Sequence, residues 1–382
     1  MALTFFSRTD TSLIARWWWT VDRWMLLVLC VLMALGSLLS FSGTPFIASK
    51  LGLSSFHMVQ KQLLLFIPSF ILMIGISMTP FSAIKRTAFW IFWISFFLLI
   101  LTPFFGTEIK GARRWVSILG FSLQPSEFVK PAFVVVSAWL LSRPMENSDH
   151  SFLSLLGKYT KIFSLALYVS VIIFLLLEPD LGMTFVISCI WGAQVFLAGL
   201  PLVWVGIVAI LGGLGLLGTY FLFPHVTSRI DRFLDPEAGD RYQINHSLDA
   251  FMNGGFFGVG PGEGIVKKHL PDAHSDFIFA VAGEEFGLFF CLLIIGLYAF
   301  IVFKSFSRVL KGANLFVLLS VGGLSIQFGL QAIINMSSSL HLIPTKGMTL
   351  PFLSYGGSSL LALAIGMGML LNLTRKRLGY IS

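Results

Sequence analysis

The sequence predicts an all-α, polytopic membrane protein with ten transmembrane helices and a large extracytoplasmic loop between helices 7 and 8. Two features of its composition support this fold class: 56% of the 382 residues are hydrophobic and only 12% are charged. Soluble globular chains contain about 25% charged residues. A soluble fold could not cover so much apolar surface, so a soluble enzyme, a disordered chain and a coiled coil are excluded.

The third observation is a series of ten apolar runs, each long enough, or nearly so, to cross a bilayer. A transmembrane helix needs about 20 residues, whereas membrane β-strands are shorter and alternate in polarity. Lipid offers backbone groups no hydrogen-bond partner, so these runs are expected to be helices. They lie at 24–42, 61–79, 87–104, 125–141, 159–177, 181–200, 202–222, 276–303, 314–335 and 355–373.

The flanking segments complete the predicted organisation: 1–23 is a cytoplasmic N-terminal segment, 24–373 is the membrane domain and 374–382 is a cytoplasmic tail. The arginines before the first run imitate a signal peptide. The run is long, however, and no Ala-x-Ala site follows it, so we expect an uncleaved span. With the N-terminus in the cytoplasm, 14 of the 26 Lys and Arg residues fall inside, including Arg375-Lys376-Arg377 after the last run.

The net charge is +8. In a membrane protein the basic residues must first be assigned to one side of the membrane, so this charge is not taken as a sign of nucleic-acid binding. The outer face carries more basic residues than orientation requires, which indicates that an anionic ligand is handled there. The three cysteines, Cys30, Cys189 and Cys291, lie within apolar runs without disulfide or metal spacing, so they are expected to be core residues.

The predicted loop, 223–275, is the one long connection in this topology. Connections in compact domains are usually much shorter, and long ones tend to be functional or disordered. This loop is not of low complexity, so we expect it to be at least partly folded. Its glycine-rich stretch, 254–264, lacks the strand and the glycine spacing of a nucleotide-binding motif and is interpreted as flexible.

Asp276 begins the predicted span 276–303, whose 28 residues would measure about 42 Å, against a hydrocarbon core of about 30 Å. The first turns, with Glu284 and Glu285, are therefore expected to rise into a polar outer vestibule. Asp276 is either a first-turn acid stabilised by the helix dipole or a general base. The pattern Asp272-x-His274-x-Asp276 is a weak metal-binding signal.

Two further segments carry charged residues at span boundaries. Glu127 and Lys130 are spaced i,i+3 and can pair, because residues at this spacing share a helix face. An ionisable group within a span is by default paired or functional, so a structural ion pair and a binding role both stay open. Arg114, with its neighbour Arg113, matches phosphate geometry but could equally be an interfacial anchor.

The segment before the last span contains Lys346, the lone cation of its loop, and small residues around Ser358 that allow helices to approach closely. The sequence Glu178-Pro179-Asp180 between two spans is interpreted as a turn. Bases from three segments and one acid at a helix mouth suit a substrate that has a pyrophosphate and a lipid tail.

These motifs, taken in order along nearly the whole chain, resemble the SEDS family (shape, elongation, division, sporulation), and its FtsW branch in particular, with RodA as the nearest relative. The resemblance rests on Gly111-Ala-Arg-Arg-Trp, Gln124-Pro-Ser-Glu, Glu178-Pro-Asp-Leu-Gly, His274-Ser-Asp-Phe-Ile-Phe-Ala-Val-Ala-Gly-Glu-Glu and Pro344-Thr-Lys-Gly-Met-Thr-Leu-Pro-Phe-Leu-Ser-Tyr-Gly-Gly-Ser-Ser.

The resemblance implies a peptidoglycan glycosyltransferase of the division septum, which polymerises lipid II on the outer face of the cytoplasmic membrane and releases undecaprenyl pyrophosphate. It implies a class B penicillin-binding protein and other division proteins of the membrane as partners. A divalent cation, Mg²⁺ or Mn²⁺, would fit the leaving group, although the sequence shows no ligand cluster. By their match to family positions, Asp276 is expected to be the general base, and the substrate-binding residues are expected to be Arg114, Glu127, Lys130, Lys346 and Ser358.

Three alternatives stay open from the sequence. A lipid II flippase should have charges that thread the membrane and often a two-fold repeat, whereas here charge is concentrated outside and no repeat is evident. A non-catalytic division scaffold would need the family fold but not Asp276. A RodA-type elongation polymerase differs from the division enzyme only in finer family features.

Overall fold

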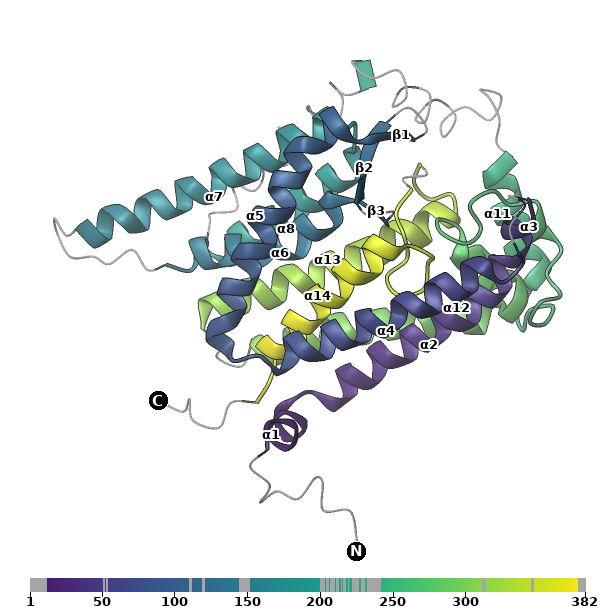
Figure 1. Ribbon diagram of the computed structural model, residues 1–382, viewed down its shortest axis with the longest axis horizontal. Coiled ribbons are helices and arrows are strands. Elements are labelled where there is room, and N and C mark those ends of the chain that lie inside the picture. The colour runs from purple at the N-terminus through teal and green to yellow at the C-terminus, as the bar shows by residue number, and fades with distance from the viewer. Residues whose placement is uncertain are drawn as a thin grey trace, which may run out of the picture.

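The computed structural model of the chain describes residues 12–50, 52, 54–109, 112–118, 121–143, 152–199, 242–310, 314–344 and 347–376, with isolated positions between 203 and 231. Nine of the ten predicted spans coincide with helices (Figure 1). The remaining one, 202–222, falls largely outside the described residues. The nine helices are α2 (Arg23–Gly43), α4 (His57–Met78), α5 (Phe81–Phe105), α6 (Pro125–Leu141), α7 (Phe152–Leu177), α8 (Leu181–Leu197), α12 (Ile278–Val309), α13 (Leu315–Ser339) and α14 (Gly357–Leu373).

Six segments of the described chain, in α2, α4, α5, α7, α12 and α13, are long and apolar enough to cross a membrane. Helices α8 and α14 are apolar but shorter. Such repeated apolar helices make the chain a multi-pass membrane protein. The most enclosed of the six segments is in α13, 72% of which is buried inside the protein, whereas those in α4, α7 and α12 are each 28% buried. Helix α13 is therefore central, and it packs against α6, α8, α12 and α14.

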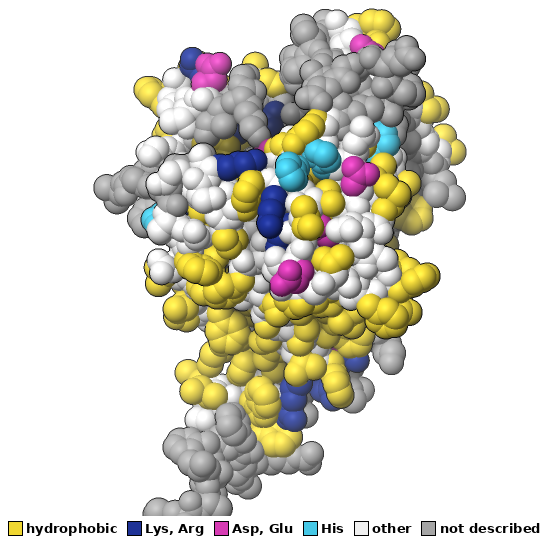
Figure 2. All heavy atoms as spheres, turned by 90° about the vertical axis from the view of Figure 1, so that its right-hand side faces the viewer, with side chains coloured by type: hydrophobic (Ala, Val, Ile, Leu, Met, Phe, Trp, Pro, Cys, Tyr) yellow, Lys and Arg dark blue, Asp and Glu magenta, His cyan; other side chains and the backbone are white. Residues whose placement is uncertain are grey.

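The two ends of the bundle differ. Helix α1 (Leu13–Thr20) and the last turn of α14 lie at one end, which we call the terminal end, and α3 (Pro45–Lys50) and α11 (Tyr242–Gly254) lie at the other, the loop end (Figure 1). Figure 2 looks onto the loop end and shows basic, acidic and histidine side chains gathered above a belt of hydrophobic ones, with further basic side chains below the belt. This layering matches a bilayer between two polar faces.

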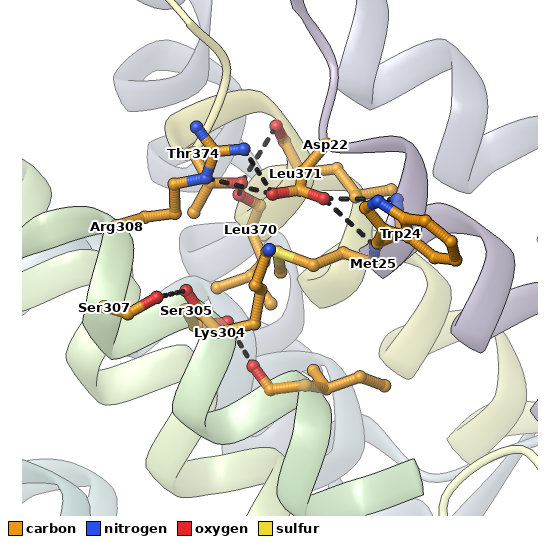
Figure 3. A network of polar contacts seen from close by, with 11 residues as sticks. Asp22, Trp24, Met25, Lys304, Ser305, Ser307, Arg308, Leu370, Leu371 and Thr374 are labelled. Carbon is orange, nitrogen blue, oxygen red and sulfur yellow. Dashed lines mark hydrogen bonds and ion pairs between the residues drawn. The ribbon is translucent and has the colours of Figure 1, made fainter.

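At the terminal end, polar contacts join helices that are distant in the sequence. The carboxylate of Asp22 accepts hydrogen bonds from the backbone N–H groups of Trp24 and Met25 and caps α2. The same carboxylate lies 2.6 and 2.9 Å from two nitrogens of the Arg308 guanidinium on α12 (Figure 3). Asn372, on α14, donates to backbone carbonyls at the end of α4, including that of Ser77 at 3.2 Å.

A small antiparallel sheet between α5 and α6 is the main departure from the predicted all-α fold. Its strands, β1 (Thr107–Ile109), β2 (Ala112–Ile118) and β3 (Phe121–Leu123), pair in the order β1-β2-β3. The segment is rich in β-branched and aromatic residues, which favour strands, and it is too short and polar to extend a span. The sheet sets the position of Arg113 and Arg114 on β2.

The large loop is folded from residue 242 onward, as predicted. Its glycine-rich stretch, 254–264, was predicted to be flexible, but it packs closely against α12. A Cβ atom on Gly254 would lie 2.0 Å from the carbonyl oxygen of Gly283, and one on Gly258 would lie 2.1 Å from that of Glu285. The N–H groups of Val259 and Gly260 donate to α12 carbonyls at 3.0 Å. The glycines therefore allow close backbone contact, and the prediction of flexibility was wrong.

Glu284 and Glu285 do not face a vestibule; their exposed fractions are 0% and 1%. The Glu284 carboxylate accepts three backbone N–H bonds of 2.8–2.9 Å from residues 265–267. The Glu285 carboxylate contacts the Lys267 ammonium and the Ser42 hydroxyl. Clustered N–H donors satisfy a buried carboxylate, so both acids anchor the loop onto α12. Helix α12 bends directly after them, at Gly287 (φ 75°).

Candidate functional site

The site is organised by the non-helical segment Gly347–Gly356 and the first turn of α14, which together we call the hub segment (347–359). On one side, the Ser354 hydroxyl donates to the Ser275 carbonyl at 2.5 Å, and the Tyr355 N–H donates to the His274 carbonyl at 2.8 Å. On the other side, the Ser358 hydroxyl accepts from the Gln124 N–H at 3.1 Å and donates to a β3 carbonyl. The hub segment thus joins the Asp276 region to the start of α6.

Asp276 lies in the turn that precedes α12, two residues before its first helical position, and its side chain is half-buried. Its N–H donates to the Asp272 carbonyl at 3.1 Å, and its own carbonyl accepts from the Asn335 amide at 2.9 Å. A Cβ atom on Gly347 would lie 3.6 Å from Asp276 Oδ2. The carboxylate therefore lies against the hub segment. Lys346 is outside the described residues, and its role stays a prediction.

Lys130 and Glu127 form the ion pair that their spacing predicted. The Lys130 Nζ atom lies 2.9 Å from Glu127 Oε2, and the two side chains are 1% and 7% exposed. Pro125 at the first turn of α6 fixes the start of this helix, because proline suits that position. The ammonium also donates to Gln331 Oε1 on α13 at 3.1 Å. The predicted ion pair is confirmed, and its role, structural or toward phosphate, stays a prediction.

Two amides on α13, which the sequence analysis missed, connect these parts. Gln331 Nε2 donates to the Thr349 carbonyl at 3.1 Å, and the Thr349 hydroxyl lies 2.7 Å from that of Ser359. Asn335 Nδ2 donates to the carbonyls of Asp276 and Met348. The available signal was the pair of amides four residues apart inside an apolar run. The structure thus brings Asp276, Glu127, Lys130 and Ser358 into one connected set of contacts.

Arg114 contacts the turn between α7 and α8 and not the hub segment, among the contacts of the described residues. Its guanidinium donates to the carbonyl of Glu178 at 3.1 Å and to that of Pro179, and it lies 4.0 Å from Asp180 Oδ2. Asp180 in turn caps α8, which confirms the predicted turn. Arg114 therefore anchors the sheet to the α7–α8 turn, and its expected contact with phosphate stays a prediction. The neighbouring Arg113 is exposed and lies 3.6 Å from Glu108.

Glu178, in the same turn, has a strongly perturbed carboxyl group. Its side chain is buried, and burial raises its pKa to about 9, with the charge of Asp180 acting in the same direction. The Thr102 hydroxyl and the Arg114 guanidinium oppose this rise in pKa but do not cancel it. The carboxyl is therefore protonated at neutral pH, and it lies directly outside the end of α7.

We expect Glu178→Gln to remove a pH dependence of stability. The folded protein holds this proton up to about pH 9, whereas the unfolded chain releases it near the ordinary value of 4.5. The contribution of Glu178 to the free energy of unfolding is therefore fully present below pH 4.5 and is lost as the pH rises toward 9. Thermal unfolding in detergent between pH 5 and 9 should show a flatter profile for Glu178→Gln, with its largest gain over wild type at high pH. A profile identical to that of wild type would contradict the assignment.

The described residues contain no group of three or more His, Cys, Asp or Glu side chains that could hold a metal ion. The pattern Asp272-x-His274-x-Asp276 accordingly does not form a metal site. The divalent cation that was expected with the pyrophosphate leaving group stays a prediction, and we assign no catalytic step to it.

Comparison with known proteins decides the family. The family model for FtsW, RodA and SpoVE, described as "Cell cycle protein", matches residues 22–378. The chain belongs to this family. It is 42% identical over 378 residues to the "Probable peptidoglycan glycosyltransferase FtsW" of Caulobacter vibrioides, covering 98% of this chain and 94% of the relative. It is 36% identical to the protein of the same name from Hydrogenovibrio crunogenus, covering 92% of this chain and 91% of that relative.

Solved structures agree with this FtsW/RodA/SpoVE assignment. A chain from a peptidoglycan synthase complex, studied for its coordination of polymerization and crosslinking, superposes with a TM-score of 0.72 at 25% identity, covering 93% of this chain and 97% of that one. RodA of Thermus thermophilus superposes with a TM-score of 0.66 at 24% identity, covering 94% and 97%. The RodA likeness supports the fold alone.

Proposed function

We propose that this chain is a peptidoglycan glycosyltransferase of the FtsW type, which polymerises lipid II on the outer face of the cytoplasmic membrane. Family membership and the curated relatives named as glycosyltransferases support the activity. The structural observation that carries the proposal is the half-buried Asp276 at the loop end, joined through the hub segment to the buried Lys130–Glu127 pair.

In the proposed reaction, the 4-hydroxyl of one lipid II molecule attacks the anomeric carbon of the growing chain. A new glycosidic C–O bond forms while the C–O bond to the pyrophosphate breaks, and undecaprenyl pyrophosphate leaves with the electron pair. Asp276 accepts the hydroxyl proton, because a carboxylate positioned beside a reacting hydroxyl can act as a general base. Lys130, Lys346 and Arg114 supply positive charge that stabilises the leaving group, and Glu127 orients Lys130. Ser358 helps to shape the site.

The proposal places the loop end outside the cell and both termini in the cytoplasm. Basic residues at the terminal end, including Arg308, Arg375 and Lys376, support this orientation, because cytoplasmic segments are enriched in Lys and Arg. The partner is a class B penicillin-binding protein that cross-links the strands. The similar chain that was solved within a synthase complex supports such a partnership. The division septum is the proposed location, in line with the FtsW relatives.

Purified wild-type protein, alone and with its penicillin-binding partner, should convert fluorescent lipid II into glycan polymer that lysozyme digests. Movement of lipid II across protein-containing vesicles without polymer would favour the flippase instead. A preparation that binds the partner but neither polymerises nor moves lipid II would favour the scaffold. Mg²⁺ or Mn²⁺ dependence should be measured in the same assay with EDTA.

A further inference from the structure

The central helix α13 carries two buried amide side chains one turn apart, Gln331 and Asn335, whose exposed fractions are 1% and 2%. We propose that these two amides are positioning residues, which fix the Asp276 carboxylate relative to the Lys130 ammonium. The proposal rests on the proposed function, because it concerns the same acid and the same cation. Neither amide is a catalytic residue, since each acts through the backbone or through Lys130.

Asn335 fixes the Asp276 side of the arrangement. Its Nδ2 atom donates to the Asp276 carbonyl at 2.9 Å and to the Met348 carbonyl at 2.6 Å. Because both partners are acceptors, only the NH₂ end of the amide can face them. The amide therefore clamps the turn of Asp276 to the hub segment. The Ser339 hydroxyl, at 3.5 Å from the same Asp276 carbonyl, is too distant to replace it.

Gln331 fixes the Lys130 side of the arrangement and uses both ends of its amide. Its Oε1 accepts from the Lys130 ammonium at 3.1 Å, while its Nε2 donates to the Thr349 carbonyl at 3.1 Å and to the Thr349 hydroxyl at 3.3 Å. Its orientation is determined as well, because an ammonium can only donate and a carbonyl can only accept. Met348 and Thr349 are adjacent, so the two amides hold consecutive residues of the hub segment.

The hub segment needs such restraints because its own backbone is unfavourable. Phe352 has a φ of 63°, a conformation that is rare for residues with a bulky side chain. The segment also runs so close to α2 that a Cβ atom on Gly36 would lie 2.0 Å from the Phe352 carbonyl oxygen. A strained segment keeps its geometry only when surrounding contacts over-determine it. Loss of either amide should therefore let the acid and the cation shift relative to each other.

The test compares near-isosteric variants that remove hydrogen bonds but keep volume: Asn335→Leu and Gln331→Met. The matched control is Gln327→Met, which changes a buried amide one turn earlier on the same helix, where the side-chain oxygen has no hydrogen-bond partner among the described residues. Polymerisation of lipid II is measured as kcat and KM, together with thermal unfolding in detergent and hydrogen exchange of peptides spanning 272–280 and 347–353.

We expect Asn335→Leu and Gln331→Met to lower kcat by about 10- to 100-fold, the loss typical of a misplacement of about 1 Å. KM should change less than about threefold, unfolding should stay within a few degrees, and exchange should rise in the two named peptides. Gln327→Met should behave as wild type.

An unchanged kcat in both Asn335→Leu and Gln331→Met, with wild type active, would overturn the positioning role. A loss of kcat that merely follows the loss of folded protein, or that Gln327→Met shares, would overturn it too. Absence of polymer from wild type itself would instead refute the proposed function, and the exchange data would show separately whether the amides hold the two peptides.

Discussion

Replacement of Asp276 by asparagine should abolish glycan polymerisation while the protein still folds. The substitution keeps the size of the side chain and the backbone bond from Asn335, but it removes the group that accepts the hydroxyl proton. Loss of a general base typically lowers the rate by about 10²–10⁴-fold. Polymer formed from fluorescent lipid II should therefore fall to the limit of detection, with the thermal unfolding temperature unchanged.

Asp272→Asn is the matched control for this prediction. Asp272 lies four residues earlier in the same turn, where its carbonyl accepts from the N–H groups of Ser275 and Asp276. Its φ of 54° suits asparagine, which tolerates this conformation well, so the turn should persist. Near-normal polymerisation by Asp272→Asn is expected. Full activity of Asp276→Asn would remove the assignment of Asp276 as the base.

Lys130→Met should be the most destabilising of the site substitutions. No hydrogen bond reaches Glu127 Oε2 among the described residues, and Lys130 is its ion-pair partner, so this change leaves a buried carboxylate without its compensating charge. Breaking a buried ion pair in this way typically costs about 3–5 kcal/mol. The purified variant should unfold at a clearly lower temperature than wild type, and less protein should accumulate in the membrane.

The double variant Glu127→Gln with Lys130→Met separates structure from chemistry. Removal of both charges leaves no unpaired ion, so most of the lost stability should return. We expect polymerisation to stay impaired, because the positive charge near the leaving group is still missing. A double variant that recovers both stability and activity would show that the pair is purely structural.

The membrane helices could be predicted from the sequence because hydropathy alone dictates them. The predicted span 125–141 agrees with α6 at both ends, since Pro125 marks its start and a polar segment follows Leu141. The ion pair of Glu127 and Lys130 was equally predictable, because helical spacing places both on one face. Local sequence determines both features.

The features that escaped prediction depend on contacts between distant segments. Glu284 was predicted to face a polar vestibule. Its carboxylate is instead bound by backbone N–H groups of residues 265–267, which are distant in the sequence. The glycine stretch resembled a flexible loop because its close partner, the backbone of α12, follows some thirty residues later. The hydrogen bond from Arg114 to the α7–α8 turn also depends on the fold, while the contact of Arg114 with phosphate stays a prediction. Gln331 and Asn335 gave a weak signal, since amides in spans often serve only packing.

In the proposed enzyme, a carboxylate at the loop end works together with a cationic site that holds a lipid-linked diphosphate. An experimental structure of the wild-type protein with bound lipid II tests it most directly. We expect an acceptor hydroxyl about 2.6–3.2 Å from the Asp276 carboxylate, with the diphosphate beside the hub segment and the start of α6. A diphosphate bound at the terminal end, or a sugar hydroxyl remote from Asp276, would contradict it.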